Sequence, residues 1–203
     1  MKLYKQFKNK HKGERIIVLG CGESASLIKN GVKCLTIGVN DITRLITTDY
    51  TVIVNYKQSF AKNRWPDIAN CKSKHIFTQL PRARLPIKDY NNKVVKIALG
   101  KRSGVNFSYD KIDYSSNSPY MAVVIAAYMG CTNIGLLGVD FTDNHFFGQT
   151  GPHVLNKRIK EIKREFNLLQ LALAKKGINF VNLSPVSTLT LPKKNLLNFI
   201  NKS

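Results

Sequence analysis

The segment SNSPYMAVVIAAYMGCTNIGLLGVDF, residues 116–141, predicts a buried helix followed by a buried strand. Residues 119–129 are apolar on nearly every face, which is typical of a helix inside a domain rather than on its surface. Pro119 suits the first turn of that helix. After Gly130, the short apolar run 133–140 is typical of a strand. A buried helix followed directly by a buried strand favours an α/β domain.

Short apolar runs on both sides of this segment predict further strands. The expected strands are residues 15–20, 32–40, 50–56, 73–80, 93–99 and 178–184. The segments between them predict a short helix ending near Asn30 and a long amphipathic helix over 154–177, and a short helix closes the chain. We therefore predict a single Rossmann-like, doubly wound α/β domain with a mostly parallel sheet over residues 15–203. A basic N-terminal arm, residues 1–14, precedes it.

Composition limits the class of protein and its partners. The 203 residues, of which 43% are hydrophobic, suit one globular domain with a proper core. The 32 Lys and Arg residues exceed the 12 Asp and Glu residues, so the net charge is +20 and predicts a polyanionic partner, either nucleic acid or an anionic membrane surface. The four cysteines stand singly, without metal-ligand spacing, so we expect reduced thiols, no metal and no cofactor in a cytoplasmic protein.

The glycine turn GCGESA, residues 20–25, is the first candidate ligand site. It lies between a predicted strand and a predicted helix, where glycines let a phosphate approach the backbone and a helix N-terminus offers free N–H groups. The spacing also fits G-x-G-x-x-A, so a nicotinamide or pterin-type enzyme is one alternative. Asp41, however, stands one position late for the ribose-binding acid of a dinucleotide site. A tight turn without a ligand is the other alternative.

Polar residues at two other strand ends form further candidates. Asn40 ends the strand 32–40, and Asp140 ends the strand 133–140. The carboxyl ends of neighbouring parallel strands line a common crevice, so Asn40 is expected to hold a ribose, base or sugar. Asp140 is expected to be a catalytic or ribose-binding carboxylate, and His145 and His153 in the next loop are candidate general bases. Helix capping by Asn40 and simple packing of the histidines are the alternatives.

The start of the buried helix is the last candidate site. Hydroxyl and N–H groups at residues 115–120 are able to hold a base edge or a phosphate. An N-cap followed by proline at the first helical position accounts for much of the same pattern without any ligand. Both interpretations stand at this point.

Five segments, taken in chain order, resemble a known enzyme family. They are IIVLGCGESASL (16–27), IGVND (37–41), SNSPYMAVVIAAYMGCTNIGLLGVDF (116–141), HFFGQTGPH (145–153) and NFVNLSPVSTL (179–189). Together they resemble the bacterial lipooligosaccharide sialyltransferases, which are metal-independent inverting glycosyltransferases that use a CMP-activated sugar. The resemblance implies a GT-A-variant-like form of the predicted fold and a CMP-sugar as donor substrate.

The resemblance also implies roles for individual residues. The residues expected along the CMP donor are Gly20, Gly22, Glu23, Ser24 and Asn40. Those expected near the cytidine are Ser116, Asn117 and Ser118. His153 would be the general base that deprotonates the acceptor hydroxyl, with His145 in reserve. In the family, tyrosines of a lid hold the donor phosphate, whereas FTDNHFFG (141–148) has none, so the donor sugar stays open, and Tyr109, Tyr114 and Arg102 are substitutes for that contact.

The charge bears on the acceptor. Lys and Arg residues occur in the arm, in the middle loops and in the long predicted helix, which favours a nucleic-acid track. We therefore expect a sugar, for example a pentose such as arabinose, to be transferred to a hydroxymethylated pyrimidine of phage DNA in the host cytoplasm, with the base flipped out. A cell-surface glycan beside a membrane surface is one alternative. A nucleic-acid-binding module without catalysis is another.

Overall fold

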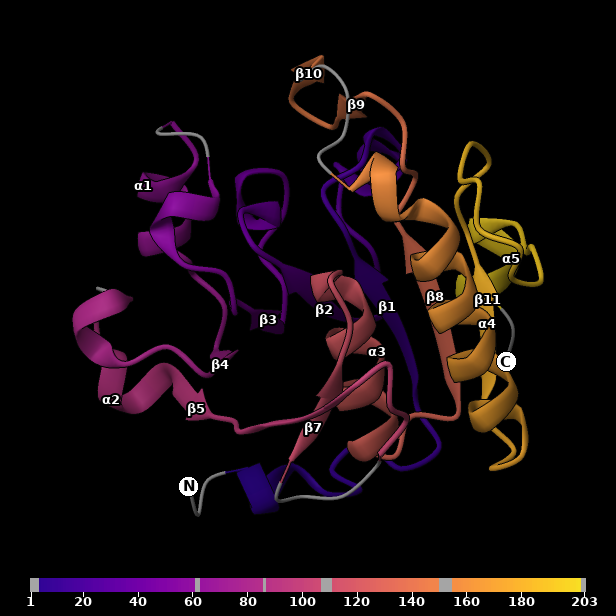
Figure 1. Ribbon diagram of the computed structural model, residues 1–203, viewed down its shortest axis with the longest axis horizontal. Coiled ribbons are helices and arrows are strands. Elements are labelled where there is room, and N and C mark those ends of the chain that lie inside the picture. The colour runs from indigo at the N-terminus through magenta and orange to yellow at the C-terminus, as the bar shows by residue number, and fades with distance from the viewer. Residues whose placement is uncertain (1–3, 61–62, 86, 107–110, 150–154, 202–203) are drawn as a thin grey trace.

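Seven parallel strands form the central sheet of the computed structural model, in the order β11-β8-β1-β2-β3-β4-β5 (Figure 1). Their bounds are β1 (Arg15–Leu19), β2 (Leu35–Val39), β3 (Tyr50–Val52), β4 (His75–Thr78), β5 (Val94–Lys96), β8 (Asn133–Leu137) and β11 (Asn179–Asn182). The structure describes residues 4–60, 63–85, 87–106, 111–149 and 155–201. The predicted doubly wound α/β fold with a parallel sheet is confirmed.

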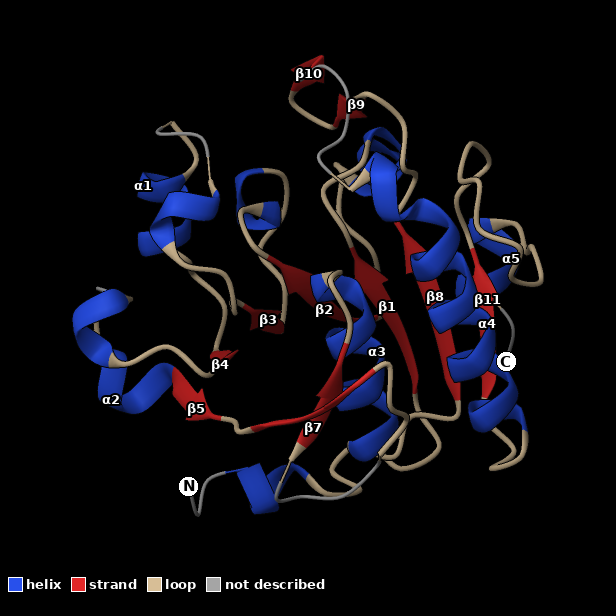
Figure 2. Cartoon of the chain, viewed as in Figure 1, coloured by secondary structure: helices blue, strands red, loops and turns tan. Residues whose placement is uncertain are grey.

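The central strands are short and buried on both faces, as helices on both sides of a parallel sheet require. The predicted strand 93–99 is divided in the structure. Its first part is β5, and after Ile97 and Ala98 the chain enters β6 (Leu99–Arg102), which pairs with β7 (Ile112–Tyr114) outside the main sheet. This two-stranded ribbon crosses over the helix that follows it (Figure 2).

That helix, α3 (Ser118–Tyr128), is buried at all 11 of its positions. It packs on β1, β2, β3 and β7, which explains why its sequence lacks a polar face. The amphipathic α4 (Ile159–Ala174), entered through the 3-10 helix η6 (Asn156–Arg158), buries Ile162, Phe166, Leu169 and Leu173 and contacts β11. The sequence period thus predicted correctly which helix is central and which lies at the surface.

The shorter helices complete the domain. They are η1 (Tyr4–Phe7), η2 (Glu23–Ile28), η3 (Ile42–Arg44), η4 (Lys57–Ser59), α1 (Trp65–Ala69), η5 (Arg82–Arg84), α2 (Tyr90–Lys93) and α5 (Leu196–Ile200). Around α1 and α2, a second and smaller apolar cluster includes Ile53, Trp65 and Leu85. On the opposite edge, Phe199 of α5 packs over Gly135 of β8.

From Tyr4 onward, the N-terminal segment belongs to the domain and does not form a separate arm. Tyr4 and Phe7 are buried in the main core. The N–H groups of Asn9 and His11 donate to the carbonyls that end α3, at distances of 3.1 and 2.8 Å. Two buried aromatic side chains among the lysines outweigh the basic composition that suggested a free arm, because apolar burial is the dominant favourable contribution to packing.

The described residues contain four free cysteines and hold no group of three His, Cys, Asp or Glu side chains suited to a metal ion. Within the same ranges, no helix has the length and apolar character needed to cross a membrane.

Candidate active site

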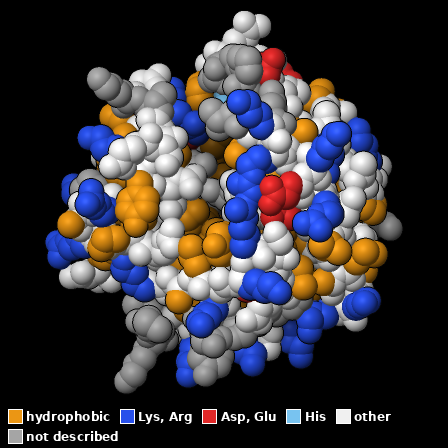
Figure 3. All heavy atoms as spheres, in the orientation of Figure 1, with side chains coloured by type: hydrophobic (Ala, Val, Ile, Leu, Met, Phe, Trp, Pro, Cys, Tyr) orange, Lys and Arg blue, Asp and Glu red, His pale blue; other side chains and the backbone are white. Residues whose placement is uncertain are grey.

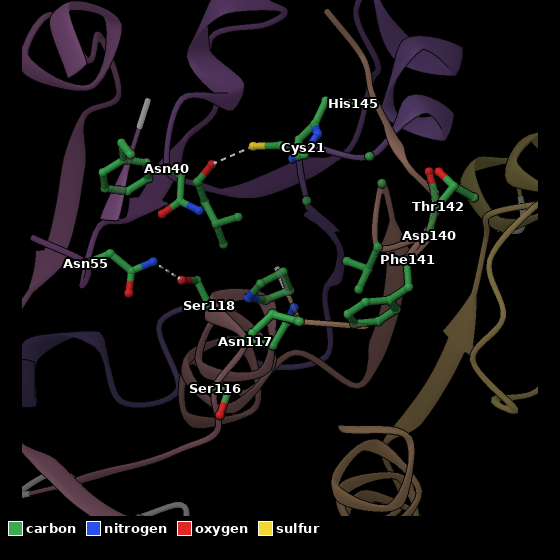
Figure 4. Close-up of a pocket in the computed structure, with 18 of the residues that line it drawn as sticks. Cys21, Asn40, Asn55, Ser116, Asn117, Ser118, Asp140, Phe141, Thr142 and His145 are labelled. Atoms are coloured by element: carbon green, nitrogen blue, oxygen red, sulfur yellow. Dashed lines mark hydrogen bonds between the residues drawn. The ribbon is translucent and has the colours of Figure 1, made fainter. Parts of the chain in front are cut away.

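A pocket of about 300 Å³ opens at the carboxyl ends of β1, β2 and β8. In the sheet, β2 lies on one side of β1 and β8 lies on the other. The pocket therefore lies at the point where the strand order reverses. Open α/β sheets bind ligands at this place. Figure 4 shows Asn40 and Asn55 on one side, Asn117 and Ser118 at the start of α3, and Cys21 and His145 at the far rim.

Most of the residues predicted from sequence do line this pocket. They are Gly20, Gly22, Asn40, Ser116, Asn117, Ser118, Asp140 and His145. Glu23 and Ser24 are not among its lining residues. His153 lies outside the residues that the structure describes, as does Tyr109, so their predicted roles stay predictions. The Tyr114 and Arg102 side chains do not line the pocket either.

The glycine turn is held by the protein itself and not left open for a phosphate. A Cβ on Gly20 would lie 2.2 Å from the carbonyl oxygen of Gly138, and one on Gly22 would lie 2.5 Å from the Asp140 carboxylate. The Gly20 and Gly22 N–H groups donate to the carbonyls of Leu137 and Gly138, at 2.8 and 2.7 Å. Close contact between the ends of β1 and β8 therefore requires these glycines, and their N–H groups are unavailable to a phosphate.

Asp140 is a buried connector rather than an exposed carboxylate. It is 1% exposed and accepts hydrogen bonds from the Ser24 N–H at 2.8 Å, the Ser24 hydroxyl at 2.7 Å and the Ser184 hydroxyl at 2.6 Å. The Ser24 hydroxyl also accepts from the Gly138 N–H at 2.9 Å. Ser24 therefore binds Asp140 and β8, which corrects its predicted position along the donor. The Glu23 carboxylate likewise binds another part of the protein, because it accepts a hydrogen bond from the side-chain amide of Asn144, in the segment after Asp140, at 3.1 Å.

Two amide oxygens of the pocket have no hydrogen-bond donor among the described residues. The Oδ1 atoms of Asn40 and Asn117 are buried, yet neither has a partner. Asn117 precedes α3, but its side chain makes no capping bond. Asn40 directly follows β2 and has a left-handed backbone φ of 54°. Buried polar atoms are nearly always paired, so these two oxygens are available to accept hydrogen bonds from a molecule that enters the pocket.

Asn55 is a further pocket residue that was not among those expected from the sequence, although the sequence carries a usable signal for it. This residue follows β3 and lies in the same pocket, where its side-chain amide donates to the Ser118 hydroxyl at 3.4 Å. It lies next to the end of the predicted strand 50–56, much as Asn40 ends the predicted strand 32–40. Ser116, on the neighbouring turn, accepts a hydrogen bond from Arg102 at 2.8 Å, so Arg102 positions a pocket residue from outside.

Asp41 is the acid that a dinucleotide site would need, and the structure withdraws it from the pocket. The side chain is fully buried and accepts from Arg64 Nε at 2.9 Å and from Arg64 Nη2. Arg44 approaches the same carboxylate at 3.6 Å. A carboxylate held in this way is unavailable to a ribose, which weighs against the nicotinamide alternative. Nearby, burial and the charge of Asp41 raise the pKa of the Cys21 thiol, so that it stays protonated.

A small hairpin, β9 (Asn144–His145) and β10 (Gly148–Gln149), lies at the rim of the pocket. His145 pairs with Gly22 through a backbone bridge, and its ring stacks on Phe147 at 5.1 Å between ring centres. The Phe147 ring also lies 4.6 Å from the Arg44 guanidinium and 5.4 Å from that of Arg64. The backbone bridge therefore ties the hairpin to the turn after β1, and the cation–aromatic contacts tie it to η3 and to the residue that precedes α1.

Among solved structures, the chain matches sialyltransferases of Campylobacter jejuni. CstII in complex with the substrate analogue CMP-3FNeuAc is 13% identical, with 94% of this chain and 89% of that chain covered and a TM-score of 0.51. The monofunctional α-2,3-sialyltransferase Cst-I is 15% identical, with 94% and 83% covered and a TM-score of 0.52. A Cst-II complex with a trisaccharide acceptor and CMP is 13% identical, with 94% of this chain and 89% of that chain covered and a TM-score of 0.54.

No protein-family model matches the sequence, and no curated protein sequence matches it either. The likeness is therefore one of fold. The chain has the GT-A-like α/β fold of these sialyltransferases, and the resemblance inferred from its sequence segments is confirmed at that level.

Proposed function

We propose that the protein is an inverting glycosyltransferase that transfers a sugar from a CMP donor to a hydroxyl acceptor. The observation that carries this proposal is the pair of unpaired amide oxygens, on Asn40 and Asn117, in the pocket at the reversal point of the sheet. A nucleoside supplies the missing donors, because cytosine has an amino group and ribose has two hydroxyls. Neighbours with the same fold have been solved in complex with CMP and with the CMP-sugar analogue CMP-3FNeuAc, which supports this choice of nucleotide.

The reaction needs few groups from the protein. The acceptor hydroxyl attacks the anomeric carbon, the bond from that carbon to the phosphate oxygen breaks, and the electron pair leaves with CMP. A histidine within reach of the hydroxyl takes its proton as the new bond forms. His153 is the proposed base, and His145 is the second candidate because it lines the pocket. Asp140 already accepts three hydrogen bonds, so its role is to fix the pocket wall.

The proposed acceptor is a hydroxymethylated pyrimidine in DNA. A groove, called here the β3–β4 groove, continues from the pocket along the carboxyl edge of the sheet. Its lining residues are Tyr56, Lys57, Gln58, Ser59, Trp65, Pro81, Ala83 and Arg84. Ser59 also lines the pocket, so the two hollows adjoin. Tyr56 is 47% exposed and lies beside Arg84, a pairing suited to stacking a base and neutralising a phosphate.

Charge outside the groove supports the same class of acceptor. Lys and Arg side chains are spread over the face drawn in Figure 3, with few acidic side chains between them. The net charge of the chain is +20. A cell-surface glycan is the second candidate, because one of the Cst-II neighbours was solved in complex with a trisaccharide acceptor. A transfer assay separates the two.

Binding calorimetry with CMP, UDP and NAD tests the donor. We expect CMP to bind and NAD not to bind, because Asp41 is held by Arg64 and the N–H groups of Gly20 and Gly22 are engaged within the protein. Binding of NAD without binding of CMP would overturn the proposal. In calorimetry, His153→Ala should keep the CMP affinity of the wild type, whereas in the transfer assay it should lose turnover. His145→Ala is the matched variant. If His145→Ala loses turnover and His153→Ala does not, His145 is the general base.

For the acceptor, the protein is incubated with a panel of nucleotide sugars and either hydroxymethylcytosine DNA or an oligosaccharide. Mass spectrometry should then detect one added sugar on the modified base. Transfer to the oligosaccharide alone would replace DNA by a glycan as the acceptor, while leaving the donor assignment in place.

A further inference from the structure

The phosphate of a nucleotide donor requires a partner that the glycine turn does not provide. The N–H groups of Gly20, Gly22 and Ser24 are all engaged within the protein. The helix after the turn, η2, is a 3-10 helix of six residues. A charged group buried in a pocket without a charged or hydrogen-bonding partner is strongly disfavoured. A positively charged side chain in the pocket would supply such a partner.

Arg64 is the lining residue that supplies this positive charge. Among the described residues that line the pocket, it is the single Lys or Arg. Its side chain is 16% exposed, so its charge is shielded from bulk water more than that of a surface arginine. Burial lowers its pKa, but hydrogen bonds and charge from Asp41 raise it further, and the net result is a pKa above the ordinary value. The guanidinium is charged at every pH of interest.

The geometry around Arg64 fixes its position and leaves donors for a ligand. A guanidinium has five N–H groups. Asp41 takes one from Nε and one from Nη2. The rings of Phe60 and Phe147 each lie 5.4 Å from the guanidinium carbon. A side chain held between a carboxylate and two rings has little rotamer freedom left to lose when it binds a ligand, which favours tight and specific binding.

The proposal rests on the function proposed above. We propose that Arg64, oriented by Asp41, binds the phosphate of the CMP donor and so provides the anion-binding group of this active site. Phe147 of the β9–β10 hairpin packs on the same guanidinium. A phosphate bound to Arg64 would therefore lie next to the hairpin that carries His145.

Calorimetry with CMP and cytidine isolates the phosphate contribution, because the two ligands differ by that group alone. In the wild type, CMP should bind more tightly than cytidine. Arg64→Gln should weaken CMP binding by about ten- to a hundredfold, the usual effect of losing a charged hydrogen bond, and should change cytidine binding by less than about twofold. Arg64→Lys, which keeps the charge but loses the planar geometry, should give an intermediate loss.

Arg44→Gln is the matched control. Arg44 contacts the same Asp41 and the same Phe147, but it is not among the residues that line the pocket. It should keep the wild-type ratio of CMP to cytidine affinity. Thermal melts verify that each variant is folded, and if Arg64→Gln is not, then Arg64→Lys carries the test.

Two results would overturn the assignment of Arg64. One is an unchanged ratio of CMP to cytidine affinity in the folded Arg64 variants. The other is an equal loss in Arg44→Gln, which would indicate a general effect of charge near Asp41. Failure of the wild type to bind both CMP and cytidine is a different result, because it contradicts the proposed function itself and removes the inference with it.

Discussion

At the scale of single residues, two asparagines in equivalent helix positions show how binding and stability separate. Asn117 precedes α3 and Asn195 precedes α5, so both are N-cap residues. The Asn195 side chain accepts from the N–H groups of Leu197 and Asn198, at 2.9 and 3.3 Å. The Asn117 side chain makes no such bond, and its buried Oδ1 has no partner. Asn195 thus stabilises a helix end, whereas Asn117 leaves a buried acceptor free toward the pocket.

Replacement of Asn117 by alanine should weaken CMP binding by about tenfold, because one hydrogen bond to the nucleoside is lost. The melting temperature should stay the same or rise, since the change removes an unpaired buried oxygen. Asn195→Ala is the control, and it should lower the free energy of unfolding by about 1 kcal/mol without affecting CMP. Calorimetry and thermal melts measure both quantities. A strongly destabilised Asn117→Ala that binds CMP normally would assign this residue to structure alone.

At the scale of elements, Asp140 joins three parts of the chain that are distant in sequence. It follows β8, binds both donors of Ser24 at the start of η2, and binds Ser184 after β11. Its place at a strand end predicts a catalytic or ribose-binding carboxylate. The structure gives it internal partners instead, and these partners lie 116 and 44 residues away.

Asp140→Ala should therefore lower the free energy of unfolding by about 3 kcal/mol, because buried donors lose a charged acceptor. Urea denaturation measures this loss. Asp67→Ala is the control, since Asp67 is a 43% exposed partner of Arg44 and should cost less than about 1 kcal/mol. A fully stable Asp140→Ala variant without turnover would restore the catalytic role expected from the sequence.

At the scale of the whole molecule, the net charge of +20 is spread over many Lys and Arg side chains. We predict that only those in the β3–β4 groove contribute to binding of the acceptor. Arg84 lies in the β3–β4 groove at the carboxyl edge of the sheet. Lys175 ends α4, which runs from the active-site side toward the opposite edge (Figure 1). These two exposed cations carry the same charge in different places, so they separate a local track from a general attraction.

Arg84→Gln should weaken the binding of single-stranded DNA and lower the slope of log affinity against log salt by about 1. CMP affinity should not change. Lys175→Gln should leave both the affinity and the slope near those of the wild type, as measured by fluorescence anisotropy across a salt series. Equal effects of the two variants would instead indicate non-specific attraction by the whole surface.

Much of the fold was accessible from the sequence because it depends on local patterns. Short apolar runs specify strands that are buried on both faces, and the segment 116–141 specifies a central helix and the strand β8. The places of Asn40 and His145 near one pocket also followed, since the carboxyl ends of parallel strands meet at one edge, and the place of Asn117 followed from the family resemblance. The N-terminal residues were misjudged, because composition does not reveal that Tyr4 and Phe7 enter the core.

By itself, then, the sequence determined the order of the elements and the edge of the sheet at which the chemistry is placed. Only the tertiary structure decided which side chains at that edge remain open to a ligand. Gly20, Ser24 and Asp140 are used by contacts between β1 and β8, whereas Asn40 and Arg64 keep unused hydrogen-bonding capacity toward the pocket. The physical reason is that a polar group's availability depends on its partners, and here those partners come from distant parts of the chain.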